Sequence, residues 1–392
     1  MIQLDIETLI ADPGTKIIVC CGSGGVGKTT LAAALGVRAA EQGRRVVTLT
    51  IDPARRLAQS LGLQELDNVP RRVAGMKLKK RADGAKNEGE LHAMMLDMKR
   101  TFDEIVEAHA SPAKAAQILA NPFYQSLSSS FAGTQEYMAM EKLGQLRASG
   151  QWDLIVVDTP PARSALDFLD APARLARFLD GRFIRMLLVP AKVGGRGYTK
   201  VMQAGLGMVT GAMMKLLGTQ LLTDVQTFVA AMDTMFGGLR QRADATAKLL
   251  RAPGTVFVVV ASPEPDALRE ASYFVDRLVE ERMPLAGVVV NRVHRSTVPQ
   301  ITAVNALAAA EALEDAELAS NGSDGTADSA LTAGVLRVHA ERMTMQATEQ
   351  RRVDGFALAH PNVLLASARA LAQDVHDLNG LRTLGSALCE AH

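Results

Sequence analysis

The 392-residue sequence contains only three cysteines, Cys20, Cys21 and Cys389. Two of them are adjacent and the third is near the end of the chain. They therefore form neither a disulfide framework nor the paired CxxC ligands of a structural zinc site. Such sparse cysteine usage is typical of a reduced compartment. We expect a cytoplasmic protein without zinc.

An excess of charge of either sign is also lacking. Lysine and arginine together number 43, and aspartate and glutamate number 42. This balance leaves no overall field to attract nucleic acid or anionic lipid, and no basic stripe for DNA is evident. We expect no nucleic-acid partner.

No hydrophobic run is long enough to cross a membrane. The stretch that comes nearest, "VMQAGLGMVTGAMM" at residues 201–214, is interrupted by glycines and polar residues and is followed by Lys215. An uninterrupted span needs about 20 apolar residues. The opening residues, "MIQLDIETLIADPG", are too polar and acidic for a signal peptide. The expected location is the cytoplasm, or the membrane surface as a peripheral protein.

Short apolar runs are the main feature that is present. They are continuously apolar, as expected of strands covered on both faces, and helix-like segments separate them. This pattern predicts an α/β fold with a doubly wound, mostly parallel sheet. The runs are "KIIVCC" from Lys16, "RRVVTLT" from Arg44, "DLIVVDT" from Asp153, "TVFVVVAS" from Thr255, "GVVVNRV" from Gly287 and "NVLLASA" from Asn362.

Two long intervals lack such runs and predict a helical subdomain inserted into this core. We assign residues 1–90, 151–170 and 252–392 to the core, and residues 91–150 and 171–251 to the helical subdomain. The second interval is rich in methionine, which suits either an adaptable apolar surface or an ordinary helical core. Residues 314–329, "EDAELASNGSDGTADS", are acidic and turn-rich and predict a solvated loop.

The stretch "CCGSGGVGKTT" matches the phosphate-binding pattern GxxxxGK[ST], and it lies between a predicted strand and a predicted helix, as that motif requires. Glycines let backbone amides surround the phosphates of ATP at a helix N-terminus. Lys28 would bind the β and γ phosphates, and the hydroxyl of Thr29 would bind Mg²⁺. The predicted nucleotide-binding residues of this loop are Gly22, Ser23, Gly24, Gly25, Val26, Gly27, Lys28, Thr29 and Thr30.

Two carboxylates complete the predicted site. Asp158 ends the strand "DLIVVD", where a phosphate-binding loop needs an acidic partner for its metal. Asp52, in "TIDPARRL", ends another strand at the crevice where open α/β sheets bind ligands, so it is placed to orient an attacking water. We predict Lys28 and Asp52 as catalytic residues, and Thr29, Asp52 and Asp158 as the Mg²⁺ site.

Together these elements resemble the anion-transporting ATPases, the arsenite-pump and tail-anchored-protein-targeting branch of the signature-lysine (MinD-like) P-loop ATPases. The resemblance is greatest to actinobacterial homologues. It covers most of the chain, through "GSGGVGKTTLAAALG", "TLTIDPARRLAQSLG", "AGTQEYMAMEKL", "WDLIVVDTPPARSALDFLDAP", "VVVASPEPDALREA" and "GVVVNRV". It implies that Glu264 and Asn291 contact the nucleotide, with Asn291 reading the adenine. It also implies a dimer that closes on ATP and a helical subdomain that receives a hydrophobic membrane-protein client.

The chain departs from this family pattern at Ser23. Relatives carry a lysine there that reaches across the dimer to the partner's γ phosphate, and a serine has neither the charge nor the length to do so. We therefore expect either a homodimer with reduced activity or a heterodimer with a paralogue that carries the lysine. Arginines in the loops that follow Asp52 and Asp158 could instead act as arginine fingers, which stabilise negative charge on the γ phosphate in the transition state. These are Arg55, Arg56 and Arg163.

Ser23 leaves ATP binding intact, because backbone amides and Lys28 perform it, but it weakens hydrolysis. Loss of one transition-state contact commonly costs about 3 to 4 kcal/mol, or a hundredfold or more in rate. The sequence thus predicts a Mg²⁺-dependent ATPase whose dimer closure moves a helical subdomain in the service of a membrane protein or membrane partner. A nucleotide-sensing regulatory subunit with little hydrolysis of its own and a partition or cell-positioning ATPase are the alternatives.

Overall fold

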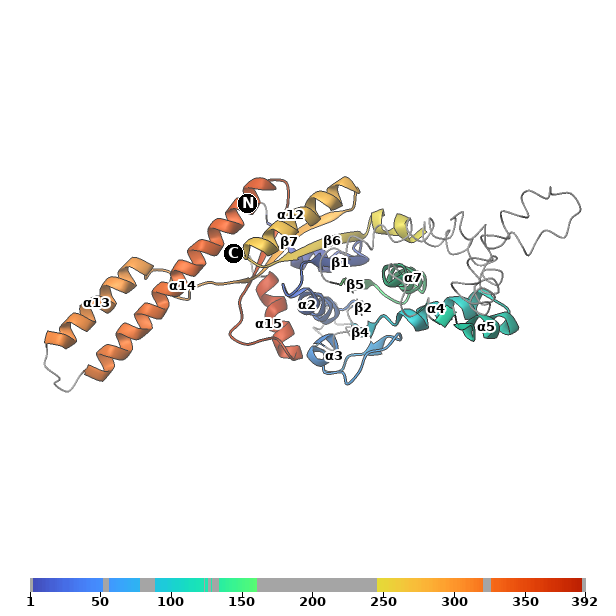
Figure 1. Ribbon diagram of the computed structural model, residues 1–392, viewed down its shortest axis with the longest axis horizontal. Helices are drawn as coiled ribbons and strands as arrows, with labels where there is room; N and C mark the ends of the chain where they lie inside the picture. Colours follow the sequence, from blue (N-terminus) through green and yellow to red (C-terminus); the bar gives the residue numbers. More distant parts are fainter. Residues whose placement is uncertain are drawn as a thin grey trace, which may run out of the picture.

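The computed structural model describes residues 3–51, 56–77, 89–122, 124–125, 128, 134–160, 245–319 and 326–389. Its centre is an eight-stranded sheet in the order β3-β4-β2-β5-β1-β6-β7-β8 (Figure 1). Neighbouring strands are parallel except β3 and β4. The strands are β1 (Ile17–Gly22), β2 (Arg45–Thr50), β3 (Arg71–Arg72), β4 (Glu90–Met95), β5 (Leu154–Asp158), β6 (Thr255–Ala261), β7 (Leu285–Val293) and β8 (Leu365–Arg369). The predicted mostly parallel sheet is confirmed.

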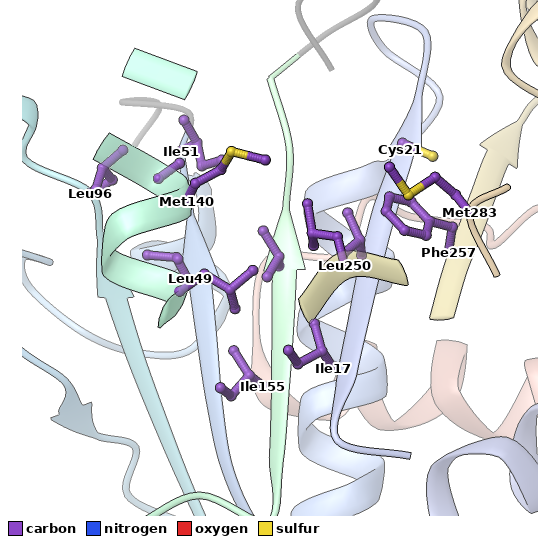
Figure 2. Close-up of a cluster of buried hydrophobic side chains, with 14 of the residues drawn as sticks. Ile17, Cys21, Leu49, Ile51, Leu96, Met140, Ile155, Leu250, Phe257 and Met283 are labelled. Atoms are coloured by element: carbon purple, nitrogen blue, oxygen red, sulfur yellow. The ribbon is translucent and has the colours of Figure 1, made fainter. Parts of the chain in front are cut away.

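Helices cover both faces of this sheet, which explains the continuously apolar strands. One hydrophobic cluster joins the sheet to α4, α5, α7 and α12, and the other joins it to α1, α2, α3 and α15. Figure 2 shows part of the first cluster. The helices are α1 (Ile6–Ala11), α2 (Lys28–Glu41), α3 (Arg56–Ser60), α4 (Met98–His109), α5 (Pro112–Leu119), α7 (Thr134–Ala148), α12 (Pro265–Glu280), α13 (Ala303–Ala319), α14 (Thr326–Ala359) and α15 (Leu378–Cys389).

Strand β4 corrects the expectation that residues 91–150 are helical throughout. The segment "ELHAMM" pairs with β2 along its whole length, from Arg45 opposite Glu90 to Thr50 opposite Met95. Leucine, methionine and alanine favour helices, so composition alone points away from a strand. Pairing with β2 and burial of Leu91 and Met94 override that preference. The division into core and helical subdomain remains a prediction, because most of the second interval, residues 161–244, lies outside the described residues.

Both flanks of residues 320–325 are helical, although composition predicts a loop over residues 314–329. Helix α13 continues to Ala319 and α14 begins at Thr326, so the predicted solvated loop is wrong for both flanks of residues 320–325. The two helices form a long hairpin that extends away from the sheet (Figure 1). Alanine is the strongest helix former, and an acidic, alanine-rich sequence therefore forms helix where a packing partner exists.

Within the described part of the chain, no helix is both long and apolar enough to cross a membrane.

Candidate nucleotide-binding site

A glycine-rich loop joins β1 to α2 at the carboxyl end of the sheet. Gly27, which caps α2, has a left-handed backbone with φ of 94°. A Cβ atom there would lie 2.4 Å from Nδ2 of Asn291, and one on Gly22 (φ 148°) would lie 2.1 Å from the carbonyl oxygen of Val260. Both positions therefore require glycine, for conformation and for space. The loop leads directly into the N-terminus of α2, whose free amides favour an anion.

The loop's lysine side chain points back into the loop. Lys28 is 6% exposed, and its Nζ donates a hydrogen bond to the carbonyl oxygen of Ser23 at 2.6 Å. Ser23 itself is buried. A buried ammonium group on the first residue of α2, next to the free amides of the helix N-terminus, favours the binding of an anion.

A buried carboxylate adjoins the start of α2. Asp158 has no exposed surface, and its Oδ2 accepts hydrogen bonds from Thr29 Oγ1 at 2.7 Å and from Thr50 Oγ1 at 2.9 Å. The sheet register brings them together, since Asp158 lies opposite Cys20 of β1 and opposite Thr50 of β2. This cluster of one carboxylate and two hydroxyls provides the hard oxygen ligands that Mg²⁺ prefers. The residues present therefore fit a magnesium site next to the loop.

Thr50 is a site residue that the sequence motifs did not single out. Thr50 is 1% exposed, and its hydroxyl donates to Asp158 Oδ2, the same oxygen that accepts from Thr29. The available signal was its position as the last residue of a predicted strand, two residues before Asp52. Hydroxyls at carboxyl ends of adjacent parallel strands meet at one edge of the sheet.

The end of β7 lies against the glycine loop. Asn291 Nδ2 donates to the carbonyl oxygen of Val26 at 2.8 Å, and Arg292 Nη1 donates to that of Gly25 at 3.1 Å. The Asn291 amide oxygen in turn accepts from the Arg292 backbone N–H at 3.0 Å. Arg292 has a left-handed backbone, with φ of 60°, which non-glycine residues seldom adopt. The sequence predicted Asn291 at the site but missed Arg292, whose unusual backbone no motif reveals.

For the other predicted residues, the described part of the structure shows no contact with the loop. Asp52, Arg55 and residues 161–244, including Arg163, lie outside the described residues, and so does the side chain of Arg56. Ile51, the residue before Asp52, donates its N–H to the carbonyl oxygen of Asp158 at 3.1 Å, so the chain is beside the end of β5 at that point. Glu264 is exposed at the N-cap of α12 and makes no capping hydrogen bond.

Gly27→Ala tests the fit of the loop against Asn291. We expect about a tenfold loss of ATP affinity, because the methyl group would force the Asn291 amide off the loop and strain the backbone. Gly150→Ala is the matched control, since Gly150 also has positive φ but no neighbour within 4 Å of an added Cβ. Calorimetric titration with ATP measures both. Equal losses of ATP affinity in the Gly27→Ala and Gly150→Ala chains would contradict this account.

The cysteines do not form a common ligand set. Cys20 belongs to one hydrophobic cluster and Cys21 to the other, so their thiols are on opposite faces of the sheet. Burial raises the pKa of the Cys21 thiol to about 12, and burial, with the nearby Asp158 carboxylate, raises the pKa of the Cys20 thiol. Both groups therefore remain protonated near neutral pH, a state that does not ligate soft metals or arsenic.

Comparisons with known proteins show the family to which the chain belongs. A model of the anion-transporting ATPase family matches residues 15–320. The chain is 28% identical to ATPase GET3 of Malassezia globosa over 44% of its own length and 47% of that protein, and 25% identical to ATPase get3 of Schizosaccharomyces japonicus over 73% and 77%. It is 26% identical to putative arsenical pump-driving ATPase 1 of Aquifex aeolicus over 40% and 38%. The chain thus spans about half the length of the first of these relatives and about three quarters of the second.

The family match covers more than half of the chain and includes the glycine loop, Asp158 and Asn291. Its members are ATP-hydrolysing enzymes, in keeping with the loop, the buried lysine and the carboxylate described above. The chain belongs to the anion-transporting ATPase family.

Proposed function

We propose that the chain binds Mg²⁺·ATP in the loop of residues 22–30 and couples its slow hydrolysis to movement of a helical subdomain that serves a membrane protein or membrane partner. The observation that carries this proposal is the convergence of Thr29 and Thr50 on Asp158 next to the glycine loop. An ordinary strand-to-helix turn has no need for a fully buried carboxylate at that place, since burying a charge is costly without a function or a partner.

The proposed roles follow from the chemistry of each group. Backbone amides of the loop and Lys28 bind the phosphates, and Thr29 and Asp158 hold the metal ion, directly or through water. A bound Mg²⁺ would offset negative charge on the phosphates. Asp52, which lies outside the described residues, orients the attacking water.

The end of β7 contributes to the nucleotide site in this proposal. Asn291 faces the base, and its amide also supports the loop through the Val26 carbonyl. Glu264, exposed at the end of β6 beside β1, is the weaker candidate for nucleotide contact, since in the described residues it makes no bond to the loop.

Ser23 determines how much hydrolysis one chain achieves alone. Its side chain cannot supply a positive charge to a second active site, so we propose either a homodimer of low activity or a heterodimer in which a paralogue's lysine serves this chain's ATP. The same observation supports a second candidate function, a nucleotide-sensing regulatory subunit that binds ATP and scarcely hydrolyses it.

The two remaining family activities have less support. Arsenic transport through thiolates conflicts with the buried, separated Cys20 and Cys21. A partition or positioning ATPase that attaches to the membrane by its tail conflicts with α15, whose apolar residues Leu381, Leu384 and Leu388 are buried within the fold rather than available to lipid. A hydrophobic membrane-protein client therefore remains the preferred substrate of the coupled movement.

Ser23→Lys distinguishes the ATPase from the regulatory subunit. If the catalytic machinery is otherwise intact, we expect the rate of ATP hydrolysis at saturating Mg²⁺·ATP to rise by up to about a hundredfold, the value of one transition-state contact. Ser23→Met, which adds length without charge, is the control and should give no gain. Unchanged ATP affinity with no gain in turnover would reject the ATPase and favour the regulatory subunit.

A further inference from the structure

The α13–α14 hairpin has an inner side and an outer side of different character. Its inner side is lined by buried alanines, which let the two helices pack closely. These are Ala306 and Ala310 of α13, and Ala333 and Ala340 of α14. Beyond the hairpin itself, α14 contacts α12 and β7. Buried residues of the far part of α14, Val353 and Phe356, join the first hydrophobic cluster.

The outer side of α14 carries a second apolar line. Leu331, Val335 and Val338 are 69%, 61% and 56% exposed, and Met345 is 40% exposed. With Arg342 they repeat at intervals of four, three, four and three residues, which is the a/d spacing of a coiled coil. At about 100° per residue these five side chains point within about 40° of one direction, and Ala333 and Ala340 point the opposite way. We call Leu331, Val335, Val338, Arg342 and Met345 the outer seam.

We propose that the outer seam pairs with the outer seam of a second copy of this chain, the two α14 helices running antiparallel about a twofold axis. In an antiparallel coiled coil the a positions of one helix meet the d positions of the other. Val335 then meets Val338 of the second copy, and Leu331 meets the aliphatic part of Arg342. The pattern is self-complementary, as a twofold interface requires.

Charge supports this occupant over a lipid surface. In the antiparallel pair, Arg342 of one copy comes within one helical turn of Asp328 of the other, and the symmetry makes this contact twice. Both side chains are exposed, and within the described residues neither forms an ion pair. A helix that lies on anionic lipid has a predominantly basic polar face, whereas here Asp328 and Glu341 flank the seam. A single charged residue at an a position is a common means of fixing register in coiled coils.

The hairpin is also attached firmly enough to hold such a contact. At its base, His294 Nδ1 lies 2.7 Å from Glu349 Oε1, and the His294 N–H donates to Glu349 Oε2 at 2.8 Å. The Ser296 N–H donates to Gln346 Oε1 at 2.8 Å. These bonds tie α14 to the segment that follows β7, so the outer seam has a fixed direction relative to the sheet.

This association is independent of nucleotide, and its test does not depend on the proposed ATPase activity. Sedimentation of the full chain without ATP or Mg²⁺ should show a dimer at micromolar concentration. Val338→Glu should shift it to monomer, with at least a tenfold increase in the dissociation constant, because two carboxylates would be buried at the axis. The circular dichroism spectrum and ATP affinity should be unchanged. A monomeric wild-type chain, or a dimer that Val338→Glu leaves intact, would overturn the proposal.

Two further experiments test the geometry. Arg342→Asp should weaken the dimer about fivefold, and combining it with Asp328→Arg should restore the original dissociation constant. For orientation, oxidation of a mixture of Val335→Cys and Val338→Cys chains should give the mixed disulfide-linked dimer, with the wild-type chain as the control for Cys389. Preferential linkage of Val335→Cys to itself would indicate parallel helices and would overturn the antiparallel arrangement. Binding of the seam to vesicles by a monomeric chain would likewise overturn it.

Discussion

Lys28→Ala is expected to lower the affinity for ATP by about a hundredfold and to abolish measurable hydrolysis. Charge-assisted hydrogen bonds contribute about 1.5–3 kcal/mol each, and Lys28 supplies the fixed positive charge within the loop itself. Its Nζ already lies inside the loop, 2.6 Å from the Ser23 carbonyl oxygen, and the side chain is 6% exposed. Competition against a fluorescent ATP analogue measures the affinity, and phosphate release measures the turnover.

Lys142→Ala is the matched control for this experiment. Lys142 is equally inaccessible, at 7% exposed, but it lies on α7 and pairs with Glu104 at 2.8 Å, away from the glycine loop. Its removal should reduce the stability of the fold and leave ATP affinity within about twofold of wild type, because no phosphate contact is lost. A Lys28→Ala chain that binds ATP as tightly as the control would show that the nucleotide, if bound at all, binds elsewhere.

Asp158→Asn is expected to have the second large effect, on metal dependence. The amide keeps the size and burial of the side chain but removes the negative charge that holds the cation, so we expect hydrolysis to fall by about a thousandfold. Binding of ATP in the absence of Mg²⁺ should be maintained or slightly strengthened, because a negative charge near the phosphates has been removed. Titrating the hydrolysis rate with Mg²⁺ should show that the variant no longer responds in the millimolar range.

The same strand supplies the control. Asp153 precedes the other end of β5 and pairs with Arg45 at 3.1 Å, and this pairing lowers the pKa of the Asp153 carboxyl. Asp153→Asn removes a carboxylate from the opposite edge of the sheet and should leave both turnover and Mg²⁺ dependence unchanged. If both variants were equally active, Asp158 would be a structural acid and the magnesium site would have to be sought elsewhere.

Much of the sheet and of the nucleotide loop follows from local sequence. The continuously apolar runs at β1, β2, β5, β6, β7 and β8 are typical of strands covered on both faces, and the glycines, Lys28 and Thr29 occur at the spacing that phosphate binding needs. The position of Asp158 beside the loop is also predictable from the sequence, because Asp158 ends a buried apolar strand. In these places local preference and tertiary packing favour the same structure.

Other features depend on contacts between residues distant in sequence. Strand β4 has helix-favouring composition and becomes a strand by pairing with β2. The hairpin depends on packing between α13 and α14, whose buried alanines lie on either side of residues 320–325 in the sequence; composition alone predicts a polar loop there. Thr50 and Arg292 join the site through the register of β2 with β5 and through the left-handed backbone at the end of β7. Neither relation is visible in a motif.

The most direct test of the account is a calorimetric titration of the wild-type chain with ATP in the presence and absence of Mg²⁺. We predict one site per chain, tighter binding with Mg²⁺, and little heat from hydrolysis, because Ser23 leaves the loop able to bind but short of one charge for catalysis. No saturable binding of ATP under either condition would contradict the central claim that the loop of residues 22–30 is a nucleotide site.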